Sequence, residues 1–137
     1  MIKFTVPGNP TTKGRPKIGR VAGHARMFQP EKTVRYESTV ALFARQAMGD
    51  RNLFDGPVSL DLLLHMPIPA SWSAKKRMAA LNGEIFPETK PDCSNVLKAV
   101  EDAMNGIVYL DDKQITDLCV IKRYGPMPCV DVIVSEI

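Results

Sequence analysis

The segment VSLDLLLHM at positions 58–66 is the feature that most constrains what this chain can fold into. It is almost wholly apolar, rich in leucine, and followed at once by Pro67 and Pro69. A short apolar run bounded by prolines is typical of a strand that lies inside a sheet. We therefore predict a central β-strand over residues 58–66. With 137 residues, the chain has the length of one ordinary domain and can bury a core around such a strand.

Other segments carry helix or strand patterns around this centre. Alternating apolar and polar residues predict an N-terminal strand over residues 2–6. Helical spacing of apolar residues predicts a helix over residues 32–48, and a short helix over residues 74–81 would be capped by Ser71 or Ser73. The remaining predicted elements are a helix over residues 96–104 and strands over residues 115–122 and 130–137.

This order of elements predicts an α/β (α+β) fold, with a mixed β-sheet and helices packed on it. We expect a single domain over residues 1–137. Residues 9–30 contain three glycines and three prolines, and we predict a long loop there. Because loops longer than about 12–15 residues in compact domains are often functional or mobile, this segment is a candidate for binding.

The composition argues against several classes of protein. Three cysteines, Cys93, Cys119 and Cys129, are an odd number without paired spacing, so we expect reduced thiols that fill small apolar spaces. No CxxC motif occurs, and His24 lies far from His65, so spacing alone predicts no zinc site. No stretch approaches the ~20 apolar residues of a membrane span, and the N-terminal MIKFTVPGNP is too short for a signal peptide. We therefore expect a cytoplasmic protein.

Charge is distributed unevenly, although the formal net charge is only +3. The segment from Lys3 to Arg26 contains six basic residues and no acid. The segment from Glu84 to Asp117 contains eight acids and three lysines. A basic segment attracts phosphate and an acidic segment can hold a cation, so this asymmetry is the first indication of function.

The predicted helix over residues 96–104 has a narrow polar stripe. Asn95, Lys98 and Asp102 lie at spacings that bring side chains together along one side of a helix. Asp92 comes just before the helix, where its carboxylate could cap the helix or point at a metal ion. Taken alone, the stripe is more typical of a solvated face with a Lys98–Asp102 ion pair than of an active site.

Two adjacent carboxylates, Asp111 and Asp112, add a second indication of metal chemistry. They follow the apolar residues 107–110, so we expect them at the edge of an element. Mg²⁺ usually binds one or two carboxylates together with water and substrate phosphate. A phosphodiester hydrolase uses such ions to polarise the phosphoryl group and activate water, and a nearby lysine could stabilise the developing charge. On their own, the two aspartates fit a polar turn equally well.

Together, the residues KPDCSNVLKAVEDAMNGIVYLDDKQI at positions 90–115 resemble the RusA family of Holliday-junction resolvases, which phages and prophages often carry. The family pattern runs approximately [KR]-P-D-x-D-N-x-x-K-x-x-x-D-x-[LM]-N-G, then a short apolar stretch and D-D-x-Q-[IV]. The likeness is looser over the N-terminal strand, the basic segment at positions 13–16 and the closing strands. It implies a Mg²⁺-dependent endodeoxyribonuclease that resolves Holliday junctions by paired symmetric cleavage in DNA recombination and repair.

The resemblance also implies roles for single residues. Asp92 and Asp112 resemble metal-binding catalytic aspartates, and Asp111 stands beside the second as a further ligand. Lys98 matches the family's catalytic lysine. The residues expected to support these groups by orienting the carboxylates are Ser94, Asn95, Asp102 and Gln114.

Ser94 departs from the family pattern, which commonly has a second metal-binding aspartate there. A serine hydroxyl is a weak neutral ligand and adds no charge, so the number of bound ions is left open. An alternative function is therefore a catalytically weak or inactive protein that binds junction DNA. A third possibility, a metal phosphohydrolase acting on small nucleotides, would not need the basic segment.

The resemblance further implies a homodimer that binds a four-way junction, because a twofold-symmetric protein can present two equal sites to two equivalent strands. Recognition through shape and backbone charge predicts steep salt dependence. The residues expected to contact phosphates are Lys13, Arg15, Lys17, Arg20 and Arg26, with Lys75, Lys76 and Arg77 as further candidates. The alternative for the basic segment is a merely solvated loop.

Overall fold

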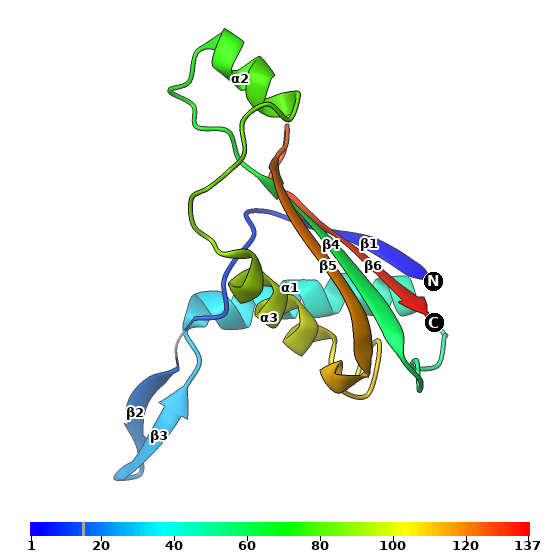
Figure 1. The fold of residues 1–137 in the computed structure, drawn as a ribbon. Helices are drawn as coiled ribbons and strands as arrows, with labels where there is room; N and C mark the ends of the chain where they lie inside the picture. The colour runs from blue at the N-terminus through cyan, green and yellow to red at the C-terminus, as the bar shows by residue number, and fades with distance from the viewer. Residues whose placement is uncertain (15) are drawn as a thin grey trace.

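The computed structural model of the chain describes residues 1–14 and 16–137, so the predicted phosphate contact at Arg15 lies outside the described residues. The described part contains helices, strands and one short 3-10 turn (Figure 1). In chain order these are β1 (Ile2–Pro7), β2 (Lys17–Val21), β3 (His24–Phe28), α1 (Glu31–Met48), β4 (Val58–Met66), α2 (Ala74–Leu81), α3 (Cys93–Met104), η1 (Asp112–Gln114), β5 (Ile115–Tyr124) and β6 (Cys129–Glu136).

Four strands form the main sheet, in the order β1-β6-β4-β5. β4 pairs with β6 in antiparallel and with β5 in parallel orientation, while β1 pairs with β6 in antiparallel orientation. The predicted central strand is therefore confirmed, and the sheet is mixed as expected. Because parallel neighbours need a long crossover, the chain passes through α2, α3 and η1 between β4 and β5.

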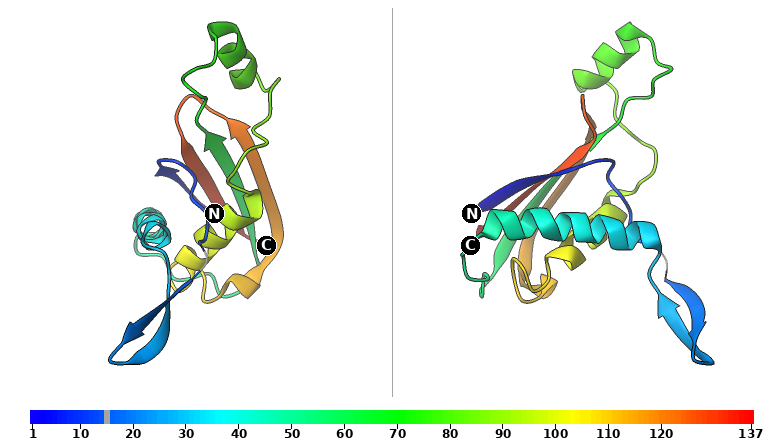
Figure 2. Two further views of the ribbon diagram at one scale, coloured as in Figure 1. Left: turned by 90° about the vertical axis from the view of Figure 1, so that its left-hand side faces the viewer. Right: turned by 180° about the vertical axis from the view of Figure 1, so that it is seen from behind.

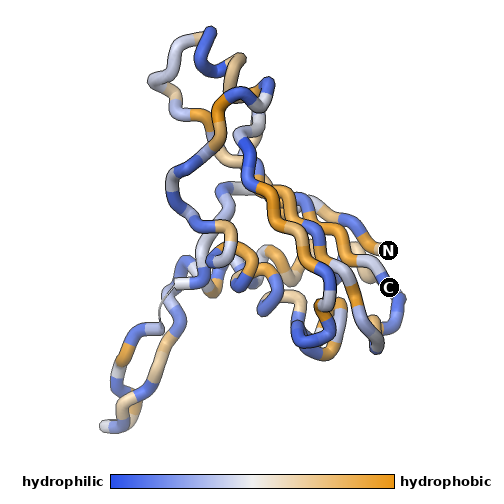
Figure 3. Tube along the Cα trace, viewed as in Figure 1, coloured by the Kyte–Doolittle hydropathy of each residue, from blue (hydrophilic) through white to orange (hydrophobic). Residues whose placement is uncertain are grey.

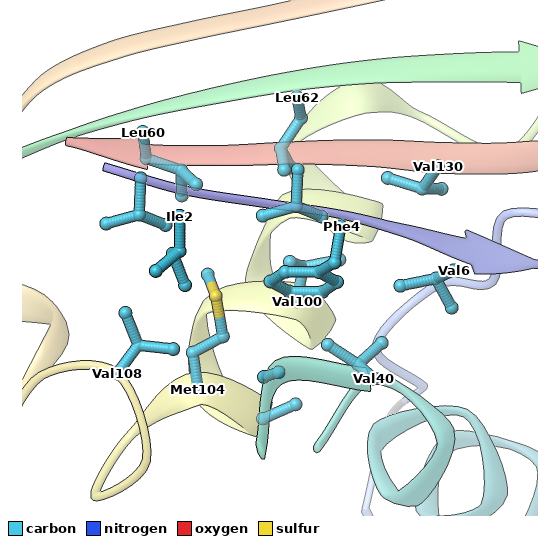
Figure 4. Close-up of a cluster of buried hydrophobic side chains, with 14 of the residues drawn as sticks. Ile2, Phe4, Val6, Val40, Leu60, Leu62, Val100, Met104, Val108 and Val130 are labelled. Atoms are coloured by element: carbon cyan, nitrogen blue, oxygen red, sulfur yellow. The ribbon is translucent and has the colours of Figure 1, made fainter. Parts of the chain in front are cut away.

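The hydrophobic core lies between the main sheet and the two longer helices (Figure 4). Alternate residues of β4 point into it, and Leu60 and Leu64 are fully buried. α1 contributes Val40, and α3 contributes Val100 and Met104. Figure 2 shows both helices on the same side of the sheet, so the predicted α+β architecture is confirmed. This packing fixes α3, which carries the candidate residues Lys98, Asn95 and Asp102 and begins directly after Asp92.

The prediction of a structureless loop over residues 9–30 was wrong. Residues in this segment form the β2–β3 hairpin, which projects from the body of the molecule (Figure 1). Val21 pairs with His24, and the two turn residues, Ala22 and Gly23, have φ angles of 53° and 81°. Positive φ at both central positions is the geometry that matches the twist of a two-residue hairpin. The glycine and proline content of residues 9–30 does not by itself distinguish a hairpin turn from an irregular loop.

A second projection is formed by α2, beyond the ends of β4 and β5 and at the opposite end of the molecule from the hairpin (Figures 1 and 2). Ser73 rather than Ser71 caps α2, because its Oγ accepts a hydrogen bond from the Lys76 backbone N–H at 3.2 Å. Of the residues in α2, only Ala80 is buried. Figure 3 shows hydrophobic residues concentrated along the main strands and mixed with hydrophilic ones in both projections. No helix in the described ranges is long and apolar enough to cross a membrane.

Candidate active site

The candidate site is built on α3 and on the turn that leads from it into β5. α3 buries Val96 and Val100 against the sheet, which leaves its polar stripe facing away from the core. After the helix, Tyr109 is fully buried and its hydroxyl donates to the backbone carbonyl of Glu101 at 2.8 Å. This hydrogen bond holds the returning chain against the helix, so the aspartates that follow lie beside it.

Gln114 fixes the position of the two aspartates through four hydrogen bonds. Its side-chain amide donates to the carbonyls of Phe54 and Gly56 at 2.8 and 3.0 Å. Its side-chain oxygen accepts from the backbone N–H groups of Leu110 and Asp111 at 2.9 and 3.1 Å. Because one side chain joins two loops and the start of η1, Gln114 holds the backbone of this turn rather than a carboxylate.

Asp111 uses one carboxylate oxygen to cap η1. Its Oδ1 accepts from the backbone N–H of Lys113 at 2.9 Å. That hydrogen bond and the neighbouring Asp112 hold the pKa of Asp111 below its usual value. The contact with Asp111, followed by burial, raises the pKa of Asp112. The negative charges of the Asp111 and Asp112 carboxylates therefore repel each other when both are ionised. A bound dication would relieve this repulsion.

Lys98 lies at the centre of an acidic cluster that consists of Glu101, Asp102 and Asp112. Its Nζ is 3.1 Å from Asp102 Oδ1, 3.5 Å from Asp112 Oδ2 and 3.9 Å from Glu101 Oε1. The bond with Asp102 is the main reason that the pKa of Lys98 is raised, so the ammonium form is favoured. The Lys98 side chain is 52% exposed, which leaves it accessible to a substrate. The predicted Lys98–Asp102 pair is present, but it belongs to a larger charge cluster.

Lys13 forms a second ion-pair group beside this cluster. Its Nζ is 2.6 Å from Glu37 Oε1 on α1 and 3.3 Å from Asp102 Oδ2. Burial lowers the pKa of Lys13, but the bonds to Glu37 and Asp102 outweigh this effect and raise it. The ammonium group of Lys13 thus faces carboxylates and not open solvent, where a predicted phosphate contact would lie.

Asp92 occupies the N-cap position of α3, but its carboxylate makes no capping hydrogen bond to the described helix backbone. The side-chain amide of Asn95 lies 3.5 Å from Asp92 Oδ2. Lys13 links this group to the acidic cluster, because its backbone N–H donates to the Asn95 carbonyl at 3.0 Å while its Nζ contacts Asp102. Ser94 is exposed in the first turn of α3.

The oxygen donors in this region fit a hard divalent cation. Asp92 is exposed, and Asp112 carries a carboxylate whose ionisation its acidic neighbours oppose. Within residues 1–14 and 16–137, however, the one set of three His, Cys, Asp or Glu ligand atoms within 4.8 Å of one another lies elsewhere. Asp92, Asp111 and Asp112 are therefore not arranged as a closed three-ligand cage, and Mg²⁺ commonly completes its shell with water and substrate phosphate.

Comparison with known proteins decides the family. A sequence model described as "Endodeoxyribonuclease RusA" matches residues 7–135. The chain belongs to the RusA family. This membership confirms the resemblance seen in the sequence, and the matched range includes both projections as well as the acidic cluster.

The chain is also similar to an individual protein. The chain is 41% identical over 138 residues to "Uncharacterized protein YqaN" of Bacillus subtilis (strain 168), a match that covers 99% of this chain and 96% of that protein. The two proteins therefore correspond over nearly their whole lengths. The name of this relative specifies no activity.

Three residues of this RusA-family site, Glu101, Lys122 and Glu37, are not among those predicted from the sequence. Glu101 is three residues after Lys98, so helical spacing could have identified it. Burial and the nearby Asp112 raise the pKa of Glu101. Lys122 on β5 donates to the carbonyls of Thr89 and Pro91 at 2.8 and 2.9 Å and so holds the segment before Asp92. Neither Lys122 nor Glu37 carries a local signal, because each reaches the site from a distant element.

The remaining predicted phosphate contacts lie on the two projections. Lys17, Arg20 and Arg26 are on the hairpin strands, and β3 is exposed along its whole length. On the other projection, Lys76 lies over the Trp72 ring at 4.0 Å, and Arg77 donates to the Pro69 carbonyl at 3.1 Å. The structure therefore separates the basic residues into two groups at opposite ends of the molecule.

Proposed function

We propose that this protein is a Mg²⁺-dependent endodeoxyribonuclease that resolves four-way DNA junctions by paired symmetric cleavage. The observation that carries the proposal is Lys98 between Asp102 and Asp112, in a chain that belongs to an endodeoxyribonuclease family. Membership of the family supports nuclease activity, and the acidic cluster supports metal dependence. We assign the protein to DNA recombination and repair, with residues 1–137 acting as one RusA-like domain.

In this proposal, Asp92 and Asp112 hold Mg²⁺, with Asp111 as an additional ligand. Bound Mg²⁺ would supply polarisation of the scissile phosphate and activation of water. The ammonium group of Lys98 is half exposed to solvent, and the carboxylates of Asp102 and Asp112 lie beside it. Such a charge can stabilise a phosphoryl oxygen as negative charge develops on it. Asn95 and Gln114 keep the carboxylate-bearing segments in place.

A homodimer supports the paired reaction, because C₂ symmetry gives two equal sites for two equivalent strands. The hairpin supports this assembly with large apolar side chains that the single chain leaves in solvent: Ile18 is 76% exposed and Met27 is 65% exposed. Ile18 pairs with Met27 across the two strands, so the two side chains are neighbours, and contiguous exposed apolar groups mark contact surfaces. The nearby arginines of the hairpin would contact DNA phosphates.

The decisive experiment incubates labelled four-way junctions with the protein in Mg²⁺, in Mn²⁺ and in chelator. We expect symmetric nicks in opposite strands with either metal and none in chelator. Asp92→Asn and Asp112→Asn should each abolish cleavage while leaving junction binding intact, because they remove metal ligands rather than phosphate contacts. Asp117→Asn is the matched control, since Asp117 is an exposed acid on β5. Normal cleavage by either site variant would refute the assignment.

Ser94 supports a second candidate, a junction-binding protein without cleavage. The neutral hydroxyl of Ser94 is exposed in the first turn of α3, at the position where the family pattern commonly has aspartate. Fewer carboxylates give weaker divalent binding. Tight junction binding with no nicks in Mg²⁺ or Mn²⁺ would favour this candidate over the nuclease.

A further inference from the structure

A second set of metal-ligand side chains lies on the main sheet, outside the acidic cluster. His65 is on β4, and Cys129 and Asp131 are on β6. Their ligand atoms all lie within 4.8 Å of one another. His65 is directly opposite Cys129 in the strand register, and Asp131 follows two residues later, so all three share one face of the sheet.

This face is the one opposite the helices. Along β6, Val130 and Val132 are fully buried in the core, so the alternating Cys129 and Asp131 point the other way. Both of these side chains and His65 are half-buried rather than exposed. The three ligands are thus separated from Lys98 and its carboxylates by the thickness of the sheet and core.

The three side chains are held by their neighbours. Thr5 on β1 donates through Oγ1 to Asp131 Oδ1 at 2.6 Å, and His65 Nε2 lies 2.9 Å from Asp131 Oδ2. Gly125 packs directly on the histidine: a Cβ there would come within 2.8 Å of His65 Nδ1. Thr5 therefore orients the carboxylate, and only glycine at position 125 leaves room for this ring position.

The donor set matches the chemistry of zinc. Imidazole nitrogen, thiolate sulfur and carboxylate oxygen are the three ligand types that Zn²⁺ binds in proteins. Tetrahedral zinc, with bonds of about 2.0–2.3 Å, needs ligand atoms roughly 3.3–3.8 Å apart. The His65–Asp131 pair at 2.9 Å would therefore separate slightly, while any ligand atoms near the 4.8 Å limit would approach by about 1 Å. Three protein ligands leave a fourth position open. Asp131 also lines a hollow of about 270 Å³ on this face, through which water or another donor can approach.

The charges of the ligands also suit a dication. A carboxylate is anionic at neutral pH, and a thiol that coordinates a metal ion is deprotonated. On coordination the Sγ–H bond breaks, the proton goes to solvent, and sulfur donates its electron pair to the metal.

We propose that His65, Cys129 and Asp131 form a Zn²⁺ site that is distinct from the acidic cluster on α3. The competing explanation is a metal-free His65–Asp131 hydrogen bond that only stabilises the sheet. The two explanations differ in one measurable property, which is a bond between a divalent metal and the Cys129 sulfur.

The test uses the full-length protein and Co²⁺, whose thiolate complexes absorb light in a way that carboxylate complexes do not. We expect one equivalent of Co²⁺ per chain to produce a thiolate absorption band that Zn²⁺ removes by displacement. Cys129→Ser should abolish the band. Cys93→Ser, at a free thiol in the first turn of α3 that does not line this hollow, is the matched control and should retain it. Absence of the band, or its persistence in Cys129→Ser, would overturn the proposal.

Two further variants separate this site from the proposed nuclease centre and from a simple folding defect. Asp112→Asn should retain the Co²⁺ band whether or not it cleaves DNA. Thr5→Val keeps the side-chain volume but removes the hydrogen bond to Asp131, and we expect Zn²⁺ affinity to fall about 10–100-fold while the circular dichroism spectrum is unchanged. Unaltered Zn²⁺ affinity in Thr5→Val would refute the orienting role of Thr5. Loss of the band in Asp112→Asn would refute a separate site.

Discussion

Lys98 and Asp102 are four residues apart on α3, and in the sequence they are best explained as an ion pair on a solvated helix face. The structure adds Asp112 at 3.5 Å and Glu101 at 3.9 Å from the same ammonium group. Lys98 and Lys13 together face four carboxylates, those of Glu37, Glu101, Asp102 and Asp112, which leaves excess negative charge that a simple ion pair does not. This excess is the residue-scale reason for proposing a cation at the site.

The first prediction concerns stability without metal. Because the pKa of Asp112 is raised in the folded state, its ionised form destabilises the fold, and this effect appears as pH rises through the raised pKa. In chelator at about pH 8, Asp112→Asn should therefore stabilise the protein by on the order of 0.5 kcal/mol. Well below about pH 3, where an aspartate carboxyl is protonated in the unfolded chain as well as in the folded one, the difference should vanish.

Thermal unfolding of both proteins across this pH range provides the measurement. Asp117→Asn controls for the loss of one negative charge elsewhere on the surface. If Asp112→Asn lowered the melting temperature at every pH, the charge-repulsion argument would fail.

A second residue-scale prediction concerns Ser94. Replacing Ser94 with Asp adds a carboxylate in the exposed first turn of α3, two residues after Asp92. If charge limits metal binding, Ser94→Asp should lower the Mg²⁺ concentration needed for half-maximal cleavage about tenfold or more, since additional carboxylates raise divalent affinity. Ser94→Asn, which adds bulk without charge, is the matched control. Equal metal dependence in wild type and Ser94→Asp would exclude Ser94 as the limiting position.

At the scale of elements, Gln114 joins the turn before β5 to the loop before β4. Removing its side chain leaves the carbonyls of Phe54 and Gly56 and two backbone N–H groups without their partner. We expect Gln114→Ala to lower the free energy of unfolding by about 1–3 kcal/mol in urea titrations and to reduce cleavage as well. Gln114→Glu keeps the acceptor but removes the donor, so it should fall between Gln114→Ala and wild type. Unchanged stability in Gln114→Ala would contradict a structural role.

The hairpin shows where element prediction fails. The sequence of β2 and β3 carries no strong apolar alternation, and Ala22-Gly23 is a less distinctive turn than Asn-Gly. By contrast, α3 and β4 were predicted well because their apolar periodicity is strong and local. The boundary of α3 still differed, because the helix begins at Cys93 and not at Val96. Local patterns identify elements that bury one face, and the hairpin buries almost none.

At the scale of the whole molecule, the β2–β3 hairpin and α2 extend in opposite directions beyond the main sheet and its two helices (Figure 1). If the hairpin contacts DNA phosphates, Arg20→Gln with Arg26→Gln should make the slope of log affinity against log salt less steep by about 2 per chain, or about 4 for the proposed homodimer, since each lost phosphate contact removes about 0.9. The matched double variant, Arg35→Gln with Arg45→Gln on exposed positions of α1, should change the slope little. Junction binding titrated over a range of salt provides the comparison. Equal slopes in the two variants would remove the hairpin from the binding surface.

The sequence by itself determined the central strand, the two long helices, the membership implied by residues 90–115 and most of the candidate catalytic residues. These features depend on periodicity and spacing within one segment, which are local properties of the chain. Only the tertiary structure decided that Lys13 contacts Glu37 and Asp102, that Lys122 holds the segment before Asp92, and that His65, Cys129 and Asp131 meet on one sheet face. Each of these contacts depends on strand register or helix packing, which brings together residues that spacing along the chain cannot relate.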